Sequence, residues 1–205
     1  MAKNTDEYGT TWWGTRWLDA LKGIDYANRI PRGFSYASQG KVFSVIMDPA
    51  KGCVKARVKG QCDPFYSVKI EFPRFSGDEK EELLREIANS PVILAKLSSR
   101  ELAPEIDSLA DGLGIHVFPR KWSDLHTTCS CPDHAVPCKH IAAVIYKLSQ
   151  EIDANPFVFF DMRGFDIVSE LARLNVNFEQ ELAEEYEVQS APTFVFFKNA
   201  GLILS

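Results

Sequence analysis

Apolar and polar positions alternate in three short runs in the first part of the chain, and this alternation predicts three strands. The runs are "KVFSVIMD" (41–48), "CVKARVKG" (53–60) and "FYSVKIEF" (65–72). The segments between them, "PAKG" and "QCDP", have the composition of tight turns. Because connections this short join antiparallel neighbours, we expect a small antiparallel meander.

The second run alternates strictly, so its two faces differ in chemistry. One face carries small apolar residues, and the other carries three cations, which are Lys55, Arg57 and Lys59. Lys69 and Glu71 share a face in the third run, so the polar face is not uniformly basic. A solvated sheet face is the simpler interpretation of the cations, and a face that contacts phosphates is the alternative.

Helical periodicity begins before these strands. Residues 11–22 place Trp13, Trp17 and Leu21 four positions apart, on one face of a short helix. A core helix anchored by aromatic side chains is the simpler interpretation of this stripe. Bases stacked on exposed tryptophan rings are the alternative.

The chain after the strands has the pattern of further helices. Residues 76–90 predict an amphipathic helix capped by Ser76, and residues 90–114 predict two short helices. Between the first helix and the strands, by contrast, residues 30–41 contain one proline and two glycines. We therefore expect turns in that segment.

Composition places the chain among ordinary globular proteins, with 45% hydrophobic and 25% charged residues. No apolar run approaches the roughly 20 residues that span a bilayer. The first residues lack the basic start and apolar core of a secretory signal. We therefore expect a cytoplasmic protein that does not contact membranes.

The net charge of −5 is unevenly distributed along the chain. Residues 1–75 contain 12 Lys and Arg against 7 Asp and Glu, whereas residues 76–205 contain 11 against 21. A surface that binds polyanions is therefore expected only in the first part. The overall acidity excludes a strongly basic nucleic-acid-binding domain.

The segment "TTCSCPDHAVPCKH" (127–140) concentrates three of the five cysteines and two of the four histidines. In a reducing compartment, clustered cysteines indicate metal binding or catalysis rather than disulfides. The pattern Cys129-x-Cys131, six residues, then Cys138-x-His140 offers three thiolates and one imidazole. Since four such ligands complete the tetrahedron of a zinc ion, we predict that these residues hold a structural Zn2+.

Neighbouring residues favour this ligand set. Ser130 is small enough for a tight turn between the first two cysteines, and Pro137 suits the first turn of a helix. Backbone N–H groups at that helix start would favour a thiolate at Cys138. Replacement of one ligand by His126 or His134 stays open. The remaining histidine and cysteines are expected outside the metal site, namely His116, Cys53 and Cys62.

The ligand pattern matches the C-x-C-x(n)-C-x-H pattern of the SWIM zinc finger. Together with the finger, "WWGTRWLDAL", "RGFSYASQGKV" and "ANPFVFFDMRG" resemble the ordered landmarks of a bacterial SWIM zinc-finger protein family, over roughly residues 11–164. The resemblance implies a module that binds nucleic acid or protein and is associated with a SNF2-type helicase ATPase. The sequence contains no G-x-x-x-x-G-K-[ST] motif, so we expect the motor to be a partner.

The last part of the chain is similar to another family. "LNVNFEQELAEEYEVQSAPTFVFFKNAG" (174–201) resembles the second half of a thioredoxin, with Pro192 and Thr193 at the family's proline–threonine position. The chain has no C-x-x-C, so the redox dithiol is absent, and Asn177 stands where the family usually has Asp. We expect a redox-inactive thioredoxin-like remnant.

Together these patterns predict an α+β fold. It comprises a small antiparallel β meander with flanking helices, a zinc-bound C-x-C, turn and helix unit, and a C-terminal partial thioredoxin-like β-α-β-β segment. We divide the chain into four segments. These are an N-terminal helix with antiparallel strands (1–75), a helical connector (76–119), the SWIM finger unit (120–165) and the thioredoxin-like tail (166–205).

We expect a non-enzymatic, zinc-binding module that binds nucleic acid or protein as an accessory to a SNF2-type helicase ATPase, with DNA favoured over RNA. The alternative is an adaptor that contacts protein alone. A third hypothesis, thiol–disulfide exchange through the tail, conflicts with the missing dithiol. The candidate nucleic-acid contacts are cations of the second strand and of the finger, namely Lys55, Arg57, Lys59, Arg120, Lys121 and Lys139.

Overall fold

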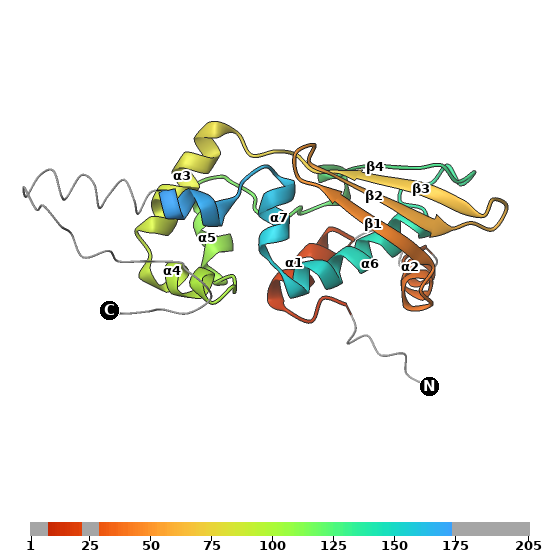
Figure 1. Ribbon diagram of the computed structural model, residues 1–205, viewed down its shortest axis with the longest axis horizontal. Helices are drawn as coiled ribbons and strands as arrows, with labels where there is room; N and C mark the ends of the chain where they lie inside the picture. Colours follow the sequence, from red (N-terminus) through yellow and green to blue (C-terminus); the bar gives the residue numbers. More distant parts are fainter. Residues whose placement is uncertain (1–7, 22–28, 174–205) are drawn as a thin grey trace, which may run out of the picture.

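The computed structural model describes residues 8–21 and 29–173 of the chain. Figure 1 shows an elongated molecule with a sheet and its helices at one end and a group of short helices at the other. The expected thioredoxin-like strands and helix, from residue 174 onward, lie outside the described residues. Among the described helices, none is long and apolar enough to cross a membrane.

Four antiparallel strands form one sheet in the order β1-β2-β3-β4. Their bounds are Val42–Asp48 (β1), Cys53–Lys59 (β2), Phe65–Glu71 (β3) and His126–Cys129 (β4). The predicted three-stranded meander is confirmed. The alternation pattern does not predict β4, because this strand has only 4 residues and pairs with a strand far away in the sequence.

The two faces of the sheet differ as the alternation in β2 predicts. The side chains of Val54, Ala56 and Val58 are at most 4% exposed. They lie on the face that is crossed by α6 (Lys139–Ala154), a helix that contacts all four strands. The three cations of β2 are exposed on the opposite face, which we call the outer sheet face.

Two helices from the N-terminal part pack against α6 (Figure 1). They are α1 (Trp12–Leu18), which continues into a 3-10 turn (Asp19–Leu21), and α2 (Arg29–Ser38). Together with α6 they form the layer beneath the sheet. The core therefore joins residues from both sides of the helical connector.

The tryptophan stripe lies in this core. Trp17 is fully buried, and its indole N–H donates to the Ile145 carbonyl of α6 at 3.1 Å. The indoles of Trp12 and Trp13 also donate to backbone carbonyls. Leu21 is also buried, and the half-buried Trp13 packs against the same core, so the core interpretation is confirmed.

Three helices at the other end of the molecule follow the predicted pattern. They are α3 (Gly77–Ala88), α4 (Pro91–Ser98) and α5 (Glu105–Gly112). The 3-10 turn Trp122–Asp124, α7 (Phe157–Met162) and helical residues 167–173 were not predicted. Ser76 caps α3 as expected, in a reciprocal capping box with Glu79. Residues 90–114 contain two short helices as predicted, α4 and α5.

The expectation of turns over residues 30–41 is wrong, because most of this segment is α2. Pro31 is the third residue of the helix, where its missing N–H breaks no intrahelical hydrogen bond. Gly33 is required by packing rather than by a turn. A Cβ on Gly33 would lie 2.4 Å from the Cβ of Ala142 on α6.

Replacement of Gly33 by Ala is therefore expected to destabilise the protein by about 1–3 kcal/mol, because the added methyl forces α2 away from α6. The matched control is Gly112→Ala, since a Cβ at this helical glycine meets no atom within 4 Å. We expect the control to be neutral or slightly stabilising. Urea unfolding of the zinc-loaded variants measures both effects. Equal stabilities would contradict the close packing of α2 on α6.

The division of the chain into four segments stays a prediction. Within the described residues, the first and third segments share one sheet, because β4 adds to β3. They also share one hydrophobic core through α6. The finger is therefore built into the sheet.

Candidate metal centre

Cys129 and Cys131 are positioned by the end of β4 and by the turn that follows it. Cys129 is the last residue of β4 and pairs with Val68 of β3. The intervening Ser130 ties the turn to β3 in both directions. Its N–H donates to the Ser67 carbonyl at 3.0 Å, and its hydroxyl accepts from the Ser67 N–H at 2.9 Å.

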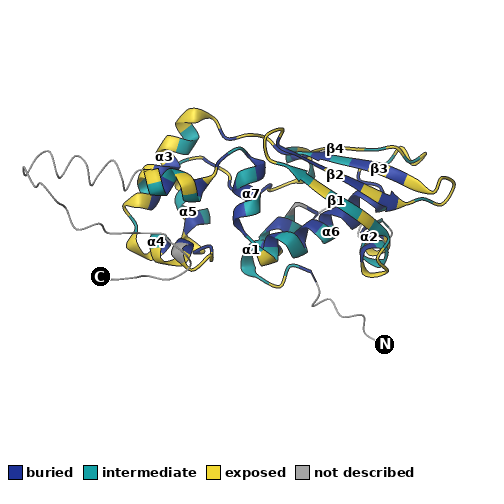
Figure 2. Ribbon diagram, in the orientation of Figure 1, coloured by how far each residue is buried: buried dark blue, intermediate teal, exposed yellow. Residues whose placement is uncertain are grey.

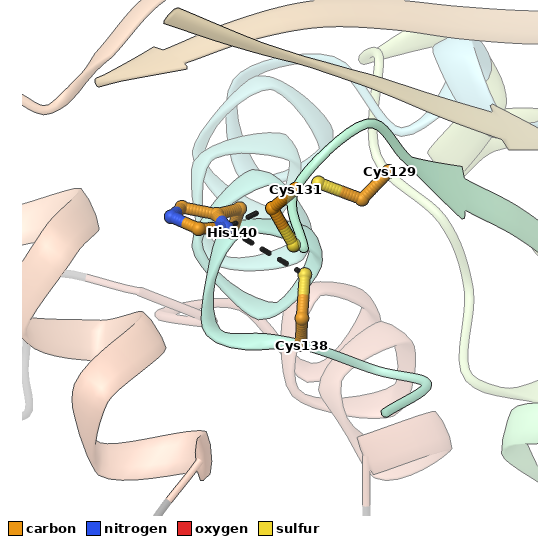
Figure 3. A group of neighbouring side chains, drawn as sticks. All are labelled: Cys129, Cys131, Cys138 and His140. Atoms are coloured by element: carbon orange, nitrogen blue, oxygen red, sulfur yellow. Dashed lines mark hydrogen bonds between the residues drawn. The ribbon is translucent and has the colours of Figure 1, made fainter. Parts of the chain in front are cut away.

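Cys138 and His140 are positioned by the start of α6. Cys138 is the N-cap residue of this helix, with an extended backbone, and His140 lies in the first turn. The cluster therefore joins the last strand of the sheet to the helix that supports the sheet. Figure 3 shows the four side chains directed toward one another between these two elements.

The geometry of the cluster fits a tetrahedral zinc ion. One donor atom from each of the four residues lies within 4.8 Å of the others. The Nδ1 atom of His140 is 3.7 Å from the Cys138 sulfur and 4.0 Å from the Cys129 sulfur. Metal–ligand bonds of about 2.0–2.3 Å imply ligand separations of roughly 3.5–3.8 Å. A small contraction would bring the cluster to these values.

The thiols differ in their readiness to ionise. The hydrogen bond from the Cys129 thiol, helped by the His140 ring and the Ile141 N–H, lowers the pKa of Cys138 to about 4. The same hydrogen bond raises the pKa of Cys129, and burial raises that of Cys131. Cys138 is thus the sulfur most readily held as a thiolate, chiefly by the Cys129 thiol and to a lesser extent by the helix start. Zinc must displace the protons of the Cys129 and Cys131 thiols, so the affinity for zinc is expected to fall as the pH is lowered.

His140 is oriented by packing. Its side chain is 3% exposed, and its ring lies between Tyr66 (4.8 Å between centroids) and Tyr36 (5.4 Å). Within the described residues, its buried Nε2 atom has no hydrogen-bond partner. The two tyrosines therefore hold Nδ1 toward the three sulfurs.

Three sulfurs and one imidazole nitrogen form a donor set that suits Zn2+. The protein supplies four ligands, which matches the coordination number of a structural zinc site. The role that such an ion supplies is folding stability, because it fixes the end of β4 against the start of α6, the helix that supports the sheet. The four residues would hold zinc between β4 and α6.

The other histidines lie outside this cluster. His126 and His134 are exposed, and the cluster found among the described residues contains neither. His116 lies 3.4 Å from a carboxylate oxygen of Asp111. The two remaining cysteines are free, one buried and one exposed, namely Cys53 and Cys62.

The six predicted nucleic-acid contacts do not form one surface. The cations of β2 lie on the outer sheet face. Lys139 lies over the Tyr36 ring, with its ammonium 4.8 Å from the ring centroid. Arg120 and Lys121 line a pocket near α5 and α7, where Arg120 binds Asp111.

The residues that support the metal cluster were not predicted from the sequence. Tyr66 shares the inward face of β3 with Val68 and Ile70, and this parity could have placed it beneath the sheet. Tyr36 was not predicted as a support because its segment, which forms α2, was expected to form turns. The hydrogen bonds of Ser130 depend on β4, for which the sequence carries no signal.

Comparisons with known proteins agree with the chemistry of the cluster. Residues 112–149 match the model of the SWIM zinc finger family, and residues 131–204 match the thioredoxin family. The two matches overlap over residues 131–149, where the structure has three of the four cluster residues and the first part of α6. The sequence contains no C-x-x-C motif.

A relative is found over most of the chain. Uncharacterized protein Rv2102 of Mycobacterium tuberculosis is 36% identical over 185 residues, which are 89% of this chain and 66% of the relative. The chain thus spans slightly less than two thirds of that protein's length. No solved structure gives a significant match. The chain therefore carries a SWIM zinc finger over residues 112–149, and the Cys3His cluster lies within it.

Proposed function

We propose that the chain is a non-enzymatic, zinc-stabilised module that binds nucleic acid, with DNA favoured over RNA. The cluster of Cys129, Cys131, Cys138 and His140 carries this proposal. Four protein ligands around zinc leave no position for a substrate or an activated water, as a catalytic zinc site requires. The role of the ion in this proposal is to stabilise the surface formed by the finger and the sheet.

Two features support nucleic acid as the ligand. The cations of β2 are exposed on a sheet whose last strand leads into the finger. Residues 1–75 also contain an excess of Lys and Arg, whereas the rest of the chain is acidic. This excess supports a polyanion-binding surface in the first part of the chain. The resemblance to bacterial SWIM-finger proteins supports a SNF2-type helicase ATPase as the protein partner.

Binding to nucleic acid is expected to weaken as salt rises, because bound cations release counterions from the phosphates. Fluorescence anisotropy of labelled single-stranded and duplex DNA and RNA, against the zinc-loaded protein, measures this dependence. Two or three phosphate contacts give a slope of about −2 in a plot of log affinity against log salt. DNA is expected to bind more tightly than RNA.

The alternative is an adaptor that contacts only protein. The net charge of −5 favours it, because acidic proteins repel polyanions. No binding of any oligonucleotide at low salt, with zinc content confirmed, would establish this alternative over nucleic-acid binding. A SNF2-type ATPase would then be the first partner to test by co-purification.

A further inference from the structure

The outer sheet face is open to solvent across several strands. The helices α1, α2 and α6 lie on the opposite side, and among the described residues no helix crosses the outer face (Figure 1). Exposed positions recur along β1, β2 and β3 on this side (Figure 2). A sheet with one covered and one open face normally has polar side chains on the open side.

This face instead carries a cluster of apolar side chains. Phe43, Ile46 and Phe65 are 57%, 62% and 39% exposed, and they are three of the five exposed large hydrophobic residues in the described chain. The register of β1 shifts between Val42 and Ser44, and such a bulge re-aims the side chain between them. The rings of Phe43 and Phe65 meet edge to face, with centroids 4.9 Å apart. An exposed aromatic pair of this kind is typical of a binding surface.

Cations lie on the same face as the aromatic pair. The Arg57 guanidinium lies 4.4 Å from the centroid of the Phe65 ring. Lys55 pairs across the sheet with Ile46 on one side and Lys69 on the other. Lys69 binds Glu71 at 2.6 Å, whereas neither Lys55 nor Arg57 has a carboxylate partner within the described residues. Two cations are therefore available to a ligand.

A groove of about 510 Å3 extends from these cations to the finger. Its lining contains three cations, several hydroxyl groups and no carboxylate. Thr128, Cys129 and Ser130 form part of its wall, so the turn that carries two zinc ligands also shapes the groove. In a chain with an overall charge of −5, this local composition is complementary to a polyanion.

The aromatic pair distinguishes between kinds of nucleic acid. In a duplex, the faces of the bases are stacked on one another, so an exposed ring cannot reach them. In a single strand, each base has a face that can stack on an aromatic side chain. In the RNA-recognition motif, for example, aromatic residues on the open face of a four-stranded sheet stack on bases of a single strand.

We propose that the outer sheet face binds single-stranded nucleic acid. Phe43 and Phe65 stack on bases, Lys55 and Arg57 contact phosphates, and the finger turn closes one end of the groove. This proposal rests on the proposed function and deepens it by naming the surface and the strandedness of the ligand. DNA and RNA share the chemistry used here, and comparison of the two separates them.

The experiment measures the affinities of labelled oligo-dT, oligo-rU and a duplex DNA for the full, zinc-loaded chain. Single strands are expected to bind more tightly than the duplex. Phe43→Ala and Phe65→Ala are each expected to weaken single-strand binding roughly tenfold. Phe65→Trp is expected to preserve binding, because it keeps a stacking ring. Val92→Ala is the matched control, since Val92 is 59% exposed on α4, away from the sheet.

Charge reversal tests the phosphate contacts. Lys55→Glu and Arg57→Glu are expected to weaken binding and to reduce the salt slope by about 1 each. Arg85→Glu makes the same charge change on α3, outside the groove, and is expected to have little effect. Zinc content and thermal unfolding confirm that each variant is folded.

Two outcomes overturn the proposal and separate it from the proposed function. The first is tighter binding of duplex than of single strands, or wild-type affinity in the Phe43→Ala/Phe65→Ala double variant. Either result contradicts the role of the outer sheet face and leaves the proposal of nucleic-acid binding intact. The second is the absence of binding to any oligonucleotide, which contradicts both the role of the outer sheet face and nucleic-acid binding. The zinc content then shows whether the zinc-binding part of the function remains.

Discussion

Replacement of Cys138 by Ser is expected to abolish stoichiometric zinc binding and to cause the largest loss of stability of any single substitution. A structural zinc contributes on the order of 10 kcal/mol of apparent free energy in small fingers, and serine cannot replace a thiolate ligand. The loss should spread beyond the finger. Cys138 caps α6, which supports all four strands and contributes to the main core.

The matched control is Cys62→Ser, because Cys62 is exposed and lies outside the cluster. This variant is expected to retain about one zinc per chain and wild-type stability. Metal analysis gives the zinc content, and far-ultraviolet circular dichroism during urea titration gives the free energy of unfolding. One zinc per chain in Cys138→Ser would contradict the assignment of this ligand. Removal of zinc from the wild-type protein with a chelator should reproduce the Cys138→Ser unfolding curve.

Replacement of Arg163 by Ala is expected to destabilise the protein by about 3 kcal/mol without loss of zinc. Arg163 follows α7 and is 7% exposed. Its Nε atom donates to the Pro73 carbonyl at 2.8 Å, and another nitrogen donates to the carbonyls of His116 and Val117. Alanine removes the donors of these hydrogen bonds. Each carbonyl that stays buried without a partner lowers the free energy of unfolding by about 1–3 kcal/mol.

The charge of Arg163 is retained despite its burial. Burial lowers the pKa of Arg163 to about 10, so the side chain is still protonated at neutral pH. The guanidinium also lies 3.7 Å from the centroid of the Phe75 ring, where a cation is favoured. One side chain thus connects the chain that follows β3 to residues 116 and 117.

The control for Arg163 is Arg173→Ala, since the Arg173 side chain is 66% exposed and pairs with Glu170 on the same helical segment. Removal of such a surface pair is expected to change stability by less than about 0.5 kcal/mol. Arg163→Lys is expected to be intermediate, because an ammonium cannot reproduce the fork of donors. Equal urea midpoints for Arg163→Ala and Arg173→Ala would contradict the role of the three carbonyls.

Short-range patterns in the sequence were sufficient for much of this protein. The three strands from residue 42 to residue 71 follow from an alternation of period two, which each strand carries within itself. The cap of α3 and the grouping of the three cysteines with His140 follow from chemistry and spacing within a few residues. Each signal is local, so a single sequence reveals it.

Only the tertiary structure decided how these parts combine. β4 exists because it pairs with β3, and no pattern in its own 4 residues requires a strand. Gly33 suggests a turn in the sequence, but in the structure it allows α2 to pack closely against Ala142 of α6. The same applies to the cations, because packing separates Lys55 and Arg57 from Arg120 and Lys121 and brings Phe43 beside Phe65. These features depend on contacts between distant segments, and such contacts are set by the packing of the whole core rather than by any local pattern.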